Sequence, residues 1–186
     1  MRFFEQLEAR ARVTGSLLCV GLDSQAGDHA TAAEALDACL RIVRATAPHA
    51  AAFKPNSAFF EQHGAAGWEA LAALIRAIPA EVPVILDAKR GDIASTAAAY
   101  AIAARALGAG AVTLSPYLGR DGVAPFLDAL DAFVLCRTSN PSAGELQDLD
   151  VGGRALFEEV ARVAPGWGPP GAVGLVVGAT APDELA

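Results

Sequence analysis

Short apolar runs alternate along this chain with longer stretches in which apolar residues recur every three or four positions. Each run has the length of a strand, and most runs are bounded by glycine or proline, which indicates strands separated by turns. The runs cover residues 17–23, 51–54, 84–89, 111–114, 132–136 and 173–178. Almost continuous apolar character is typical of parallel strands that are buried on both faces.

The longer stretches predict helices. One helix, near residues 3–12, precedes the first strand, and a later helix can be capped by Asp92 and stopped by Gly108. Two further helical faces consist of Ala35, Leu36, Cys39, Leu40 and Val43, and of Leu71, Leu74, Ile75 and Ile78. We therefore expect an α/β fold made of one helix and then six strand–helix units with parallel strands. Doubly wound sheets and barrels share this pattern, so the periodicity leaves both open.

Length and composition narrow the class of protein. With 186 residues, 53% of them hydrophobic, and no linker, the chain is expected to form a single domain over residues 1–186. The formal net charge of −7 argues against a nucleic-acid partner. The first residues lack the apolar core of a signal peptide, and the longest apolar region, 93–116, is interrupted by Arg105. We therefore expect no membrane segment and a cytoplasmic location.

The cysteines and histidines do not suggest a metal site. Cys19, Cys39 and Cys136 are far apart and surrounded by apolar residues, so we expect small buried side chains in a reducing compartment. The three histidines lack ligand-like spacing.

Polar residues gather where the predicted strands end, and in parallel α/β folds these ends build the site. Asp87 and Lys89 are two apart in a strand, which predicts that they share a face. A carboxylate beside an ammonium group favours the charged form of both, so Lys89 could serve as a proton donor. Asp92 would add a second negative charge, and Lys54 could bridge the carboxylates. The candidate positions are Asp23, Lys54, Asn56, Asp87, Lys89, Asp92 and Ser139.

Each of these features also has a purely structural interpretation. Asp87 and Lys89 could be an ordinary ion pair at a strand end, Asp92 a helix cap, and residues 138–141 a plain turn. Taken together, with every one at the carboxyl end of a strand, they favour a functional site.

The pattern Asp87-x-Lys89-x-x-Asp92 after the third predicted strand resembles the signature of orotidine 5′-phosphate decarboxylases. The flanking stretches 20–23, 53–56 and 138–141 also resemble that family, and the latter two resemble its longer bacterial subgroup. The resemblance covers nearly the whole chain. It implies a (β/α)8 TIM barrel that forms a homodimer with shared active sites.

The resemblance also implies a reaction. It is the conversion of orotidine 5′-phosphate to uridine 5′-phosphate and carbon dioxide in pyrimidine biosynthesis, with no cofactor and no metal. Lys89 would stabilise the carbanion at C6 and then protonate it, while Asp87 lies against the substrate carboxylate. Lys54 and Asp92 would complete the charged network, with Asp92 supplied by the neighbouring subunit.

By the same resemblance, further residues would bind the substrate. Asp23 and Lys54 would hold ribose hydroxyls, together with Thr96 from across the dimer, and Asn56 would also bind the substrate. Ser139 would form a hydrogen bond with the pyrimidine.

Six strand–helix units are two short of a complete barrel, and phosphate loops usually follow the seventh and eighth strands. We therefore expect the phosphate-binding residues to lie outside this sequence, and the 186-residue chain alone to fold poorly and show little activity.

One alternative is a magnesium-dependent sugar-phosphate decarboxylase of the same superfamily. Such enzymes need an acidic ligand at the end of the second strand, where this chain has Lys54. The other alternative is an inactive truncated remnant.

Overall fold

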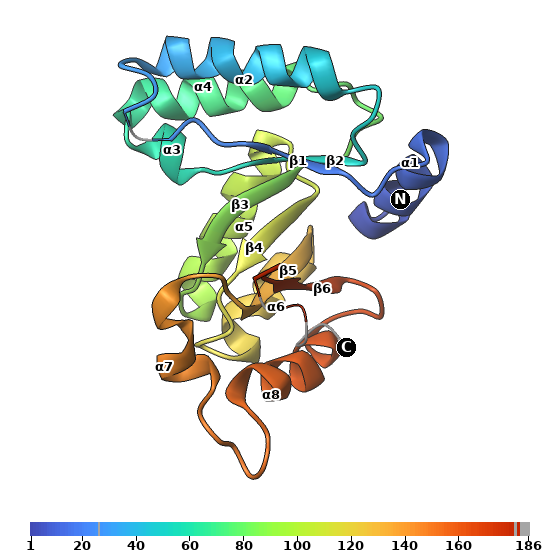
Figure 1. The fold of residues 1–186 in the computed structure, drawn as a ribbon, viewed down its shortest axis with the longest axis vertical. Helices are drawn as coiled ribbons and strands as arrows, with labels where there is room; N and C mark the ends of the chain where they lie inside the picture. Colours follow the sequence, from blue (N-terminus) through green and yellow to red (C-terminus); the bar gives the residue numbers. More distant parts are fainter. Residues whose placement is uncertain (26, 181, 183–186) are drawn as a thin grey trace. The chain divides into compact units, whose positions relative to one another are not determined.

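The computed structural model describes residues 1–25, 27–180 and 182, and it contains all six predicted strands (Figure 1). In chain order the elements are α1 (Phe3–Thr14), β1 (Cys19–Leu22), α2 (Ala32–Thr46), β2 (Ala52–Pro55), α3 (Ala58–Glu61), α4 (Gly64–Ala77), β3 (Ile85–Arg90), α5 (Ala94–Leu107), β4 (Ala111–Leu114), α6 (Arg120–Leu127), β5 (Asp131–Arg137), η1 (Pro141–Ala143), α7 (Gly144–Gln147), α8 (Leu156–Val163), η2 (Ala164–Trp167) and β6 (Val173–Val177). The predicted alternation of strands and helices is therefore present.

The chain divides into two compact units. The first contains Met1–Ala88 and Ile102–Val112, and the second contains Lys89–Ala101 and Thr113–Ala186. The divisions fall inside β3, α5 and β4 rather than in a linker.

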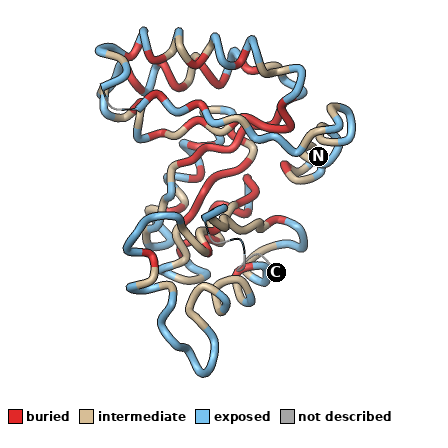
Figure 2. The backbone as a smooth tube through the Cα atoms, viewed as in Figure 1, coloured by how far each residue is buried: buried red, intermediate tan, exposed pale blue. Residues whose placement is uncertain are grey.

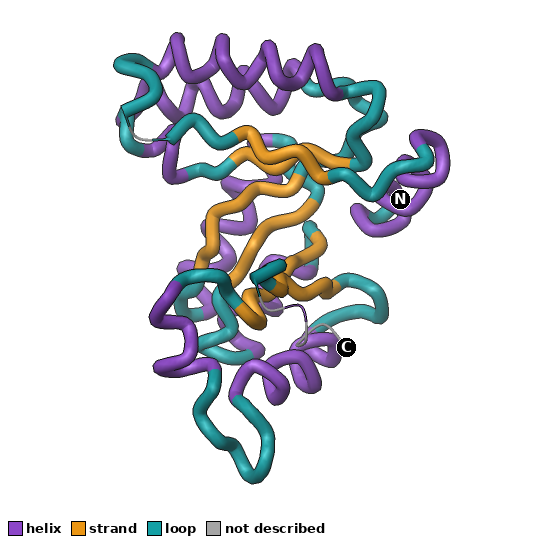
Figure 3. The backbone as a smooth tube through the Cα atoms, in the orientation of Figure 1, coloured by secondary structure: helices purple, strands orange, loops and turns teal. Residues whose placement is uncertain are grey.

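In the first unit, β1 and β2 pair in parallel, from Cys19 opposite Ala52 to Leu22 opposite Pro55. Parallel bridges then join β2 to the chain around β3, and one of them pairs Asn56 with Asp87. The helices α2 and α4 pack against each other beside these strands (Figure 3). The carboxyl ends of β1 and β2 therefore lie next to each other, and the end of β2 lies beside Asp87 of β3.

The helix α2 shows how local sequence forms this unit. At its start the Thr31 hydroxyl accepts a hydrogen bond from the Glu34 N–H, and the Glu34 carboxylate accepts one from the Thr31 N–H. This reciprocal capping satisfies backbone groups that would otherwise lack partners at a helix start. Ala35, Cys39 and Val43 then form a buried stripe on α2, as their spacing predicts (Figure 2).

The second unit contains β5 and β6, which pair in parallel with an irregularity between Leu135 and Arg137. The second sheet has the strand order β3-β4-β5-β6. Each strand thus has as its neighbour the next strand along the chain. A doubly wound sheet reverses its strand order part of the way across, whereas a barrel does not. The observed order favours the barrel.

The helix α5 begins and ends near the predicted signals. Asp92 precedes its first turn, and the Asp92 Oδ1 atom accepts a hydrogen bond of 2.8 Å from the Ile93 N–H. Gly108 follows its last residue with φ of 95°, a left-handed conformation that favours glycine at the end of a helix.

One prediction about the cysteines was wrong. Cys39 and Cys136 are buried, but Cys19 is exposed. Cys19 lies on β1, and β2 is the only strand that pairs with β1 among the residues that the structure describes. The apolar run 17–23 therefore contains a strand, but neighbouring elements do not bury all of its side chains. Burial, and secondly the charge of Asp23, raises the pKa of Cys39 to about 11, which keeps this thiol protonated.

Within the described part of the chain, no helix is both long enough and apolar enough to cross a membrane.

Candidate active site

Lys54 on β2 and Asp87 on β3 form an ion pair. The Lys54 Nζ atom donates to the Asp87 Oδ2 atom at 2.8 Å. The Asp87 side chain is only 7% exposed, and the Lys54 side chain is 31% exposed. The Ser57 N–H also donates to the Asp87 carbonyl oxygen at 3.1 Å, which fastens the end of β2 to β3. Two residues that are 33 positions apart thus meet through strand pairing.

The electrostatics of the pair keep Lys54 charged. Burial lowers the pKa of Lys54, but the hydrogen bond to Asp87 and the negative charges of Asp87 and Asp23 together raise it above its usual value. Asp23 follows β1 and is itself exposed. Gly21 leaves room for this carboxylate, because a Cβ atom there would lie 2.9 Å from the Asp23 Oδ2 atom. The first unit therefore brings Asp23, Lys54 and Asp87 into one electrostatic group.

The pair gives a prediction about stability. Lys54→Met removes the cation from a nearly buried carboxylate, so the free energy of unfolding should fall by about 2 kcal/mol, less than for a fully buried pair because Lys54 is partly exposed. The pKa of Lys54 is raised in the folded protein. The contribution of Lys54 is therefore complete below the unfolded-state pKa of about 10.4 and is lost as the pH rises through the folded value. Urea unfolding across this range measures the difference.

Arg12→Met is the matched control, because Arg12 pairs with Glu8 on the exposed face of α1. We expect its effect to stay within about 0.5 kcal/mol. A Lys54→Met deficit that does not narrow at alkaline pH would show that the ion pair is not its source.

Lys89 has an unusual backbone conformation. Its φ is 46°, the only positive φ of a residue other than glycine among those described. Its N–H donates to the Thr113 Oγ1 atom at 2.9 Å, and Thr113 is buried on β4. A left-handed residue with a side chain costs about 1–2 kcal/mol, and such strain clusters at functional sites.

This conformation corrects the argument that Asp87 and Lys89 share a face. Two residues of a strand share a face only where the backbone is extended at both, whereas Lys89 is left-handed and exposed and Asp87 is buried. The alternation of a regular strand therefore ends at Lys89.

Asp92 and Thr96 lie at the start of α5, separated by about one turn of helix. Both are half-buried. The loop before them packs closely on the chain after β4, since a Cβ atom on Gly91 would lie 2.9 Å from the Ser115 Cβ atom. Asp92 therefore bonds to the residue that precedes α5 and not to an N–H of the helix itself, so it does not act as the N-cap that one structural interpretation assigned to it.

Ser139 follows β5 and is exposed. The Thr138 hydroxyl donates to the Asn140 Oδ1 atom at 2.6 Å, so the side chains on either side of Ser139 are bonded to each other. On the other side of Ser139, Gly178 follows β6, and a Cβ atom there would lie 3.3 Å from the Ser139 Cβ atom.

Two residues that support the site, Thr113 and Gln147, were not predicted from the sequence. Thr113 is a polar residue inside an apolar strand, a signal that could have been noticed. Gln147 lies eight residues beyond Ser139 and forms hydrogen bonds with Thr138; no sequence pattern marks it.

The predicted site residues fall into two sets, one in each compact unit. The first set is Asp23, Lys54, Asn56 and Asp87, and the second is Lys89, Asp92, Thr96 and Ser139. The members follow a strand or lie in its last residues, apart from Asp87, which is the third of the six residues of β3, and Thr96, in the first turn of α5. That the two sets share one substrate stays a prediction.

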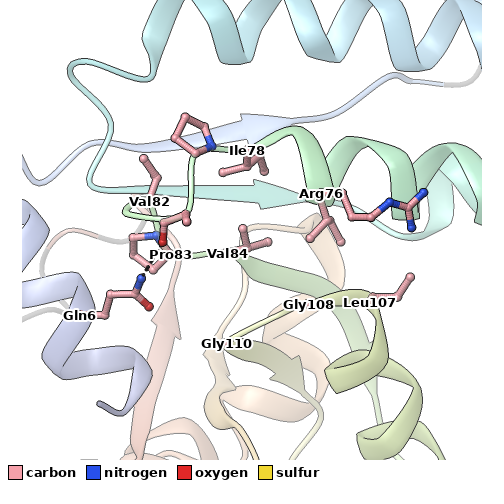
Figure 4. Close-up of a pocket in the computed structure, with 12 residues that line it drawn as sticks. Gln6, Arg76, Ile78, Val82, Pro83, Val84, Leu107, Gly108 and Gly110 are labelled. Atoms are coloured by element: carbon pink, nitrogen blue, oxygen red, sulfur yellow. Dashed lines mark hydrogen bonds between the residues drawn. The ribbon is translucent and has the colours of Figure 1, made fainter.

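A cavity of about 270 Å³ lies elsewhere in the first unit, and its lining is shown in Figure 4. Val84 and Gly110, which directly precede β3 and β4, line it, and Gln6 donates to the Ala80 carbonyl oxygen at 3.2 Å. None of the predicted site residues lines this cavity, which lies at the amino ends of the strands. Nor does the described part of the chain contain a group of three or more histidine, cysteine or acidic residues that could hold a metal ion.

Comparison with known proteins identifies the family. Residues 16–186 match the model of the orotidine 5′-phosphate decarboxylase / HUMPS family. The chain is 51% identical to an orotidine 5′-phosphate decarboxylase of Roseiflexus castenholzii, over all of this chain and 72% of that protein. It is 46% identical to one of Herpetosiphon aurantiacus, over 99% of this chain and 73% of that protein.

Comparison with solved structures indicates the same family. The OMP decarboxylase of Leishmania donovani superposes with a TM-score of 0.92 and 54% identity, covering 100% of this chain and 74% of that one. The UMP synthase of the same organism gives a TM-score of 0.93 with 54% identity, covering 100% of this chain and 41% of that one. The predicted family and the (β/α)8 fold class, with about six units in this chain, are thereby confirmed. The chain belongs to the orotidine 5′-phosphate decarboxylase / HUMPS family.

Proposed function

We propose that this chain carries the catalytic residues of an enzyme that converts orotidine 5′-phosphate to uridine 5′-phosphate and carbon dioxide, without a cofactor. The observation that carries the proposal is the ion pair between Lys54 and the nearly buried Asp87, which lies two residues before the strained Lys89. The chain is also about half identical to proteins named as decarboxylases. The reaction belongs to pyrimidine biosynthesis, and we propose that it takes place in the cytoplasm.

In this mechanism the bond between C6 and the carboxylate breaks, and its electron pair stays on C6. That pair occupies an in-plane orbital that the ring delocalises poorly. The Lys89 ammonium group stabilises the charge more in the transition state than in the ground state, which is what accelerates a reaction. Lys89 then gives a proton to C6 and regains one from water. Thr113 holds the Lys89 backbone in place for this role.

The carboxylates and Lys54 form the rest of the charged network. Asp87 lies against the substrate carboxylate and adds repulsion that is relieved when carbon dioxide leaves. Lys54 donates a hydrogen bond to Asp87 and balances its negative charge. Asp92 joins from the neighbouring subunit.

We propose substrate-binding roles for the remaining residues. Asp23, Lys54 and Asn56 hold the ribose, together with Thr96 from the second subunit, and Ser139 holds the pyrimidine. The support is their common position at or just beyond strand ends, where parallel α/β folds bind ligands.

We also propose that residues 1–186 belong to one domain, because the two compact units are connected inside β3, α5 and β4. A homodimer is supported by an apolar surface next to Asp92. Ile93 is 63% exposed, Tyr117 is 83% exposed and Leu118 is 40% exposed. Ile93 and Leu118 also line one hollow in the second unit. A second copy seated on this surface would bring Asp92 to its partner.

The experiment is to add the protein to orotidine 5′-phosphate and follow the loss of substrate absorbance, with product identified by chromatography. From a full-length barrel that contains residues 1–186 we expect equal amounts of uridine 5′-phosphate and carbon dioxide, at a rate that EDTA does not change, and we expect little turnover from residues 1–186 alone. A rate abolished by EDTA and restored by magnesium would favour the metal-dependent alternative. A folded protein with no turnover would favour the inactive remnant.

A further inference from the structure

We propose that Gln147 is a positioning residue for the pyrimidine: its side-chain amide holds Thr138 and thereby sets the position of Ser139. This inference rests on the proposed function, because Ser139 is assigned to the pyrimidine there. All the contacts that support it lie within the second compact unit.

The Gln147 amide makes two hydrogen bonds with one residue. Its Oε1 atom accepts from the Thr138 N–H at 2.9 Å, and its Nε2 atom donates to the Thr138 Oγ1 atom at 2.7 Å. A planar amide that both donates and accepts fixes the orientation of its partner as well as the distance. Gln147 is the last residue of α7, so a helix end is joined to the segment that leaves β5.

The hydrogen bonds continue past Ser139. The Thr138 hydroxyl, which accepts from Gln147, donates to the Asn140 Oδ1 atom at 2.6 Å. The residues before and after Ser139 are thus tied into one chain of bonds. In the part of the chain that the structure describes, no hydrogen bond uses the Ser139 hydroxyl, and this residue is exposed. The arrangement holds the backbone of Ser139 and leaves its hydroxyl for a ligand.

A neighbouring ion pair joins the same two segments, between Arg137, which precedes Thr138, and Asp148, which follows Gln147. Asp148 follows Gln147, and its Oδ1 atom lies 2.8 Å from the Arg137 Nη1 atom. The Arg137 guanidinium group also lies 5.4 Å from the centre of the Phe157 ring on α8. Two consecutive residues at the end of α7 therefore hold two consecutive residues at the end of β5.

The other side of Ser139 is packed against β6. The Gly178 N–H donates to the Arg137 carbonyl oxygen at 2.8 Å. A Cβ atom on Gly178 would lie within 3.4 Å of three Ser139 atoms, its N, Cα and Cβ. Ser139 is therefore fixed by Gln147 through Thr138 and by direct packing on Gly178. Loss of the amide removes one of these two constraints, and small displacements of a substrate-holding group are costly.

The test is a double-mutant cycle between Gln147→Leu and Ser139→Ala, with kcat and KM measured for orotidine 5′-phosphate. Gln147→Leu keeps the size of the side chain and removes both hydrogen bonds. We expect KM to rise about tenfold, with a fall in kcat, because the pyrimidine is held less well. In the Ser139→Ala background, Gln147→Leu should have little further effect on KM, since the residue through which it acts is gone.

A merely structural role would reduce the fraction of folded enzyme, which lowers the apparent kcat and leaves KM unchanged. Gln62→Leu is the matched control, because Gln62 donates to the Phe59 carbonyl oxygen at 2.8 Å in the first unit. It should leave KM unchanged. Thr138→Val removes the hydroxyl at the other end of the same contact, so it tests the inference if Gln147→Leu does not fold.

Distinct outcomes separate this inference from the proposed function. If the increases in KM caused by Gln147→Leu and by Ser139→Ala multiply in the double variant, the positioning role is overturned, and the proposed decarboxylase activity is not affected. An unchanged KM in Gln147→Leu, beside a raised KM in Ser139→Ala, would do the same. A wild-type protein that neither turns over orotidine 5′-phosphate nor binds uridine 5′-phosphate by calorimetry would overturn both.

Discussion

In the complete enzyme, the Lys89→Ala variant is expected to lose decarboxylation while it remains folded. Removing one preorganised donor from a site that stabilises developing charge typically costs about 3–4 kcal/mol of transition-state stabilisation. Lys89 is assigned both this stabilisation and the proton transfer, so we expect kcat to fall by more than about 10³-fold. The measurement is turnover of orotidine 5′-phosphate at saturating substrate, with folding followed by circular dichroism.

The left-handed backbone of Lys89 supplies a second readout. Glycine adopts a φ of 46° without strain, whereas alanine at this φ would be strained as lysine is. Lys89→Gly should therefore be as inactive as Lys89→Ala but more stable by about 1 kcal/mol. Equal stability of the two variants would mean that the strain is relieved when the lysine is lost. Near-normal turnover by either variant would remove Lys89 from the mechanism.

Arg90→Ala is the control for loss of a positive charge at the end of β3. Arg90 lies over the Tyr100 ring, 4.9 Å from its centre, and has no proposed role in the chemistry. We expect its kcat to change less than about tenfold.

Mixing two inactive full-length variants, Asp87→Ala and Asp92→Ala, is expected to restore activity. If each subunit lends Asp92 to its partner, a mixed dimer holds one site with both defects and one with none. Random exchange makes half of the dimers mixed, so activity should return to about a quarter of the wild-type value. The measurement is turnover against the mixing ratio, which should peak at equal amounts.

Subunit exchange must be shown separately, by labelling the two variants and following energy transfer between them. Two Asp87→Ala preparations with different labels, mixed in the same way, exchange subunits without forming an intact site, so they give the baseline activity. Exchange without recovery would place Asp92 in the site of its own subunit or outside catalysis. Restored activity would also support the surface of Ile93, Tyr117 and Leu118 as the dimer interface.

The sequence by itself determined the order of the elements and the family. Apolar runs and helical faces are local patterns, because a strand and a helix each repeat within a few residues. The run 111–114 became β4 over the same residues, and the stop signal at Gly108 ends α5. Residues 87–92 carried enough of the family pattern to be identified without any structure.

The tertiary structure decided which of these residues meet. The Lys54–Asp87 bond depends on β2 being joined to β3, and the hold of Gln147 on Thr138 depends on α7 turning back to β5. Contacts between distant residues have no period along the chain, so local patterns do not report them. The left-handed backbone of Lys89 and the exposure of Cys19 were missed for the same reason: both depend on what surrounds a strand, whereas alternation describes only the strand itself.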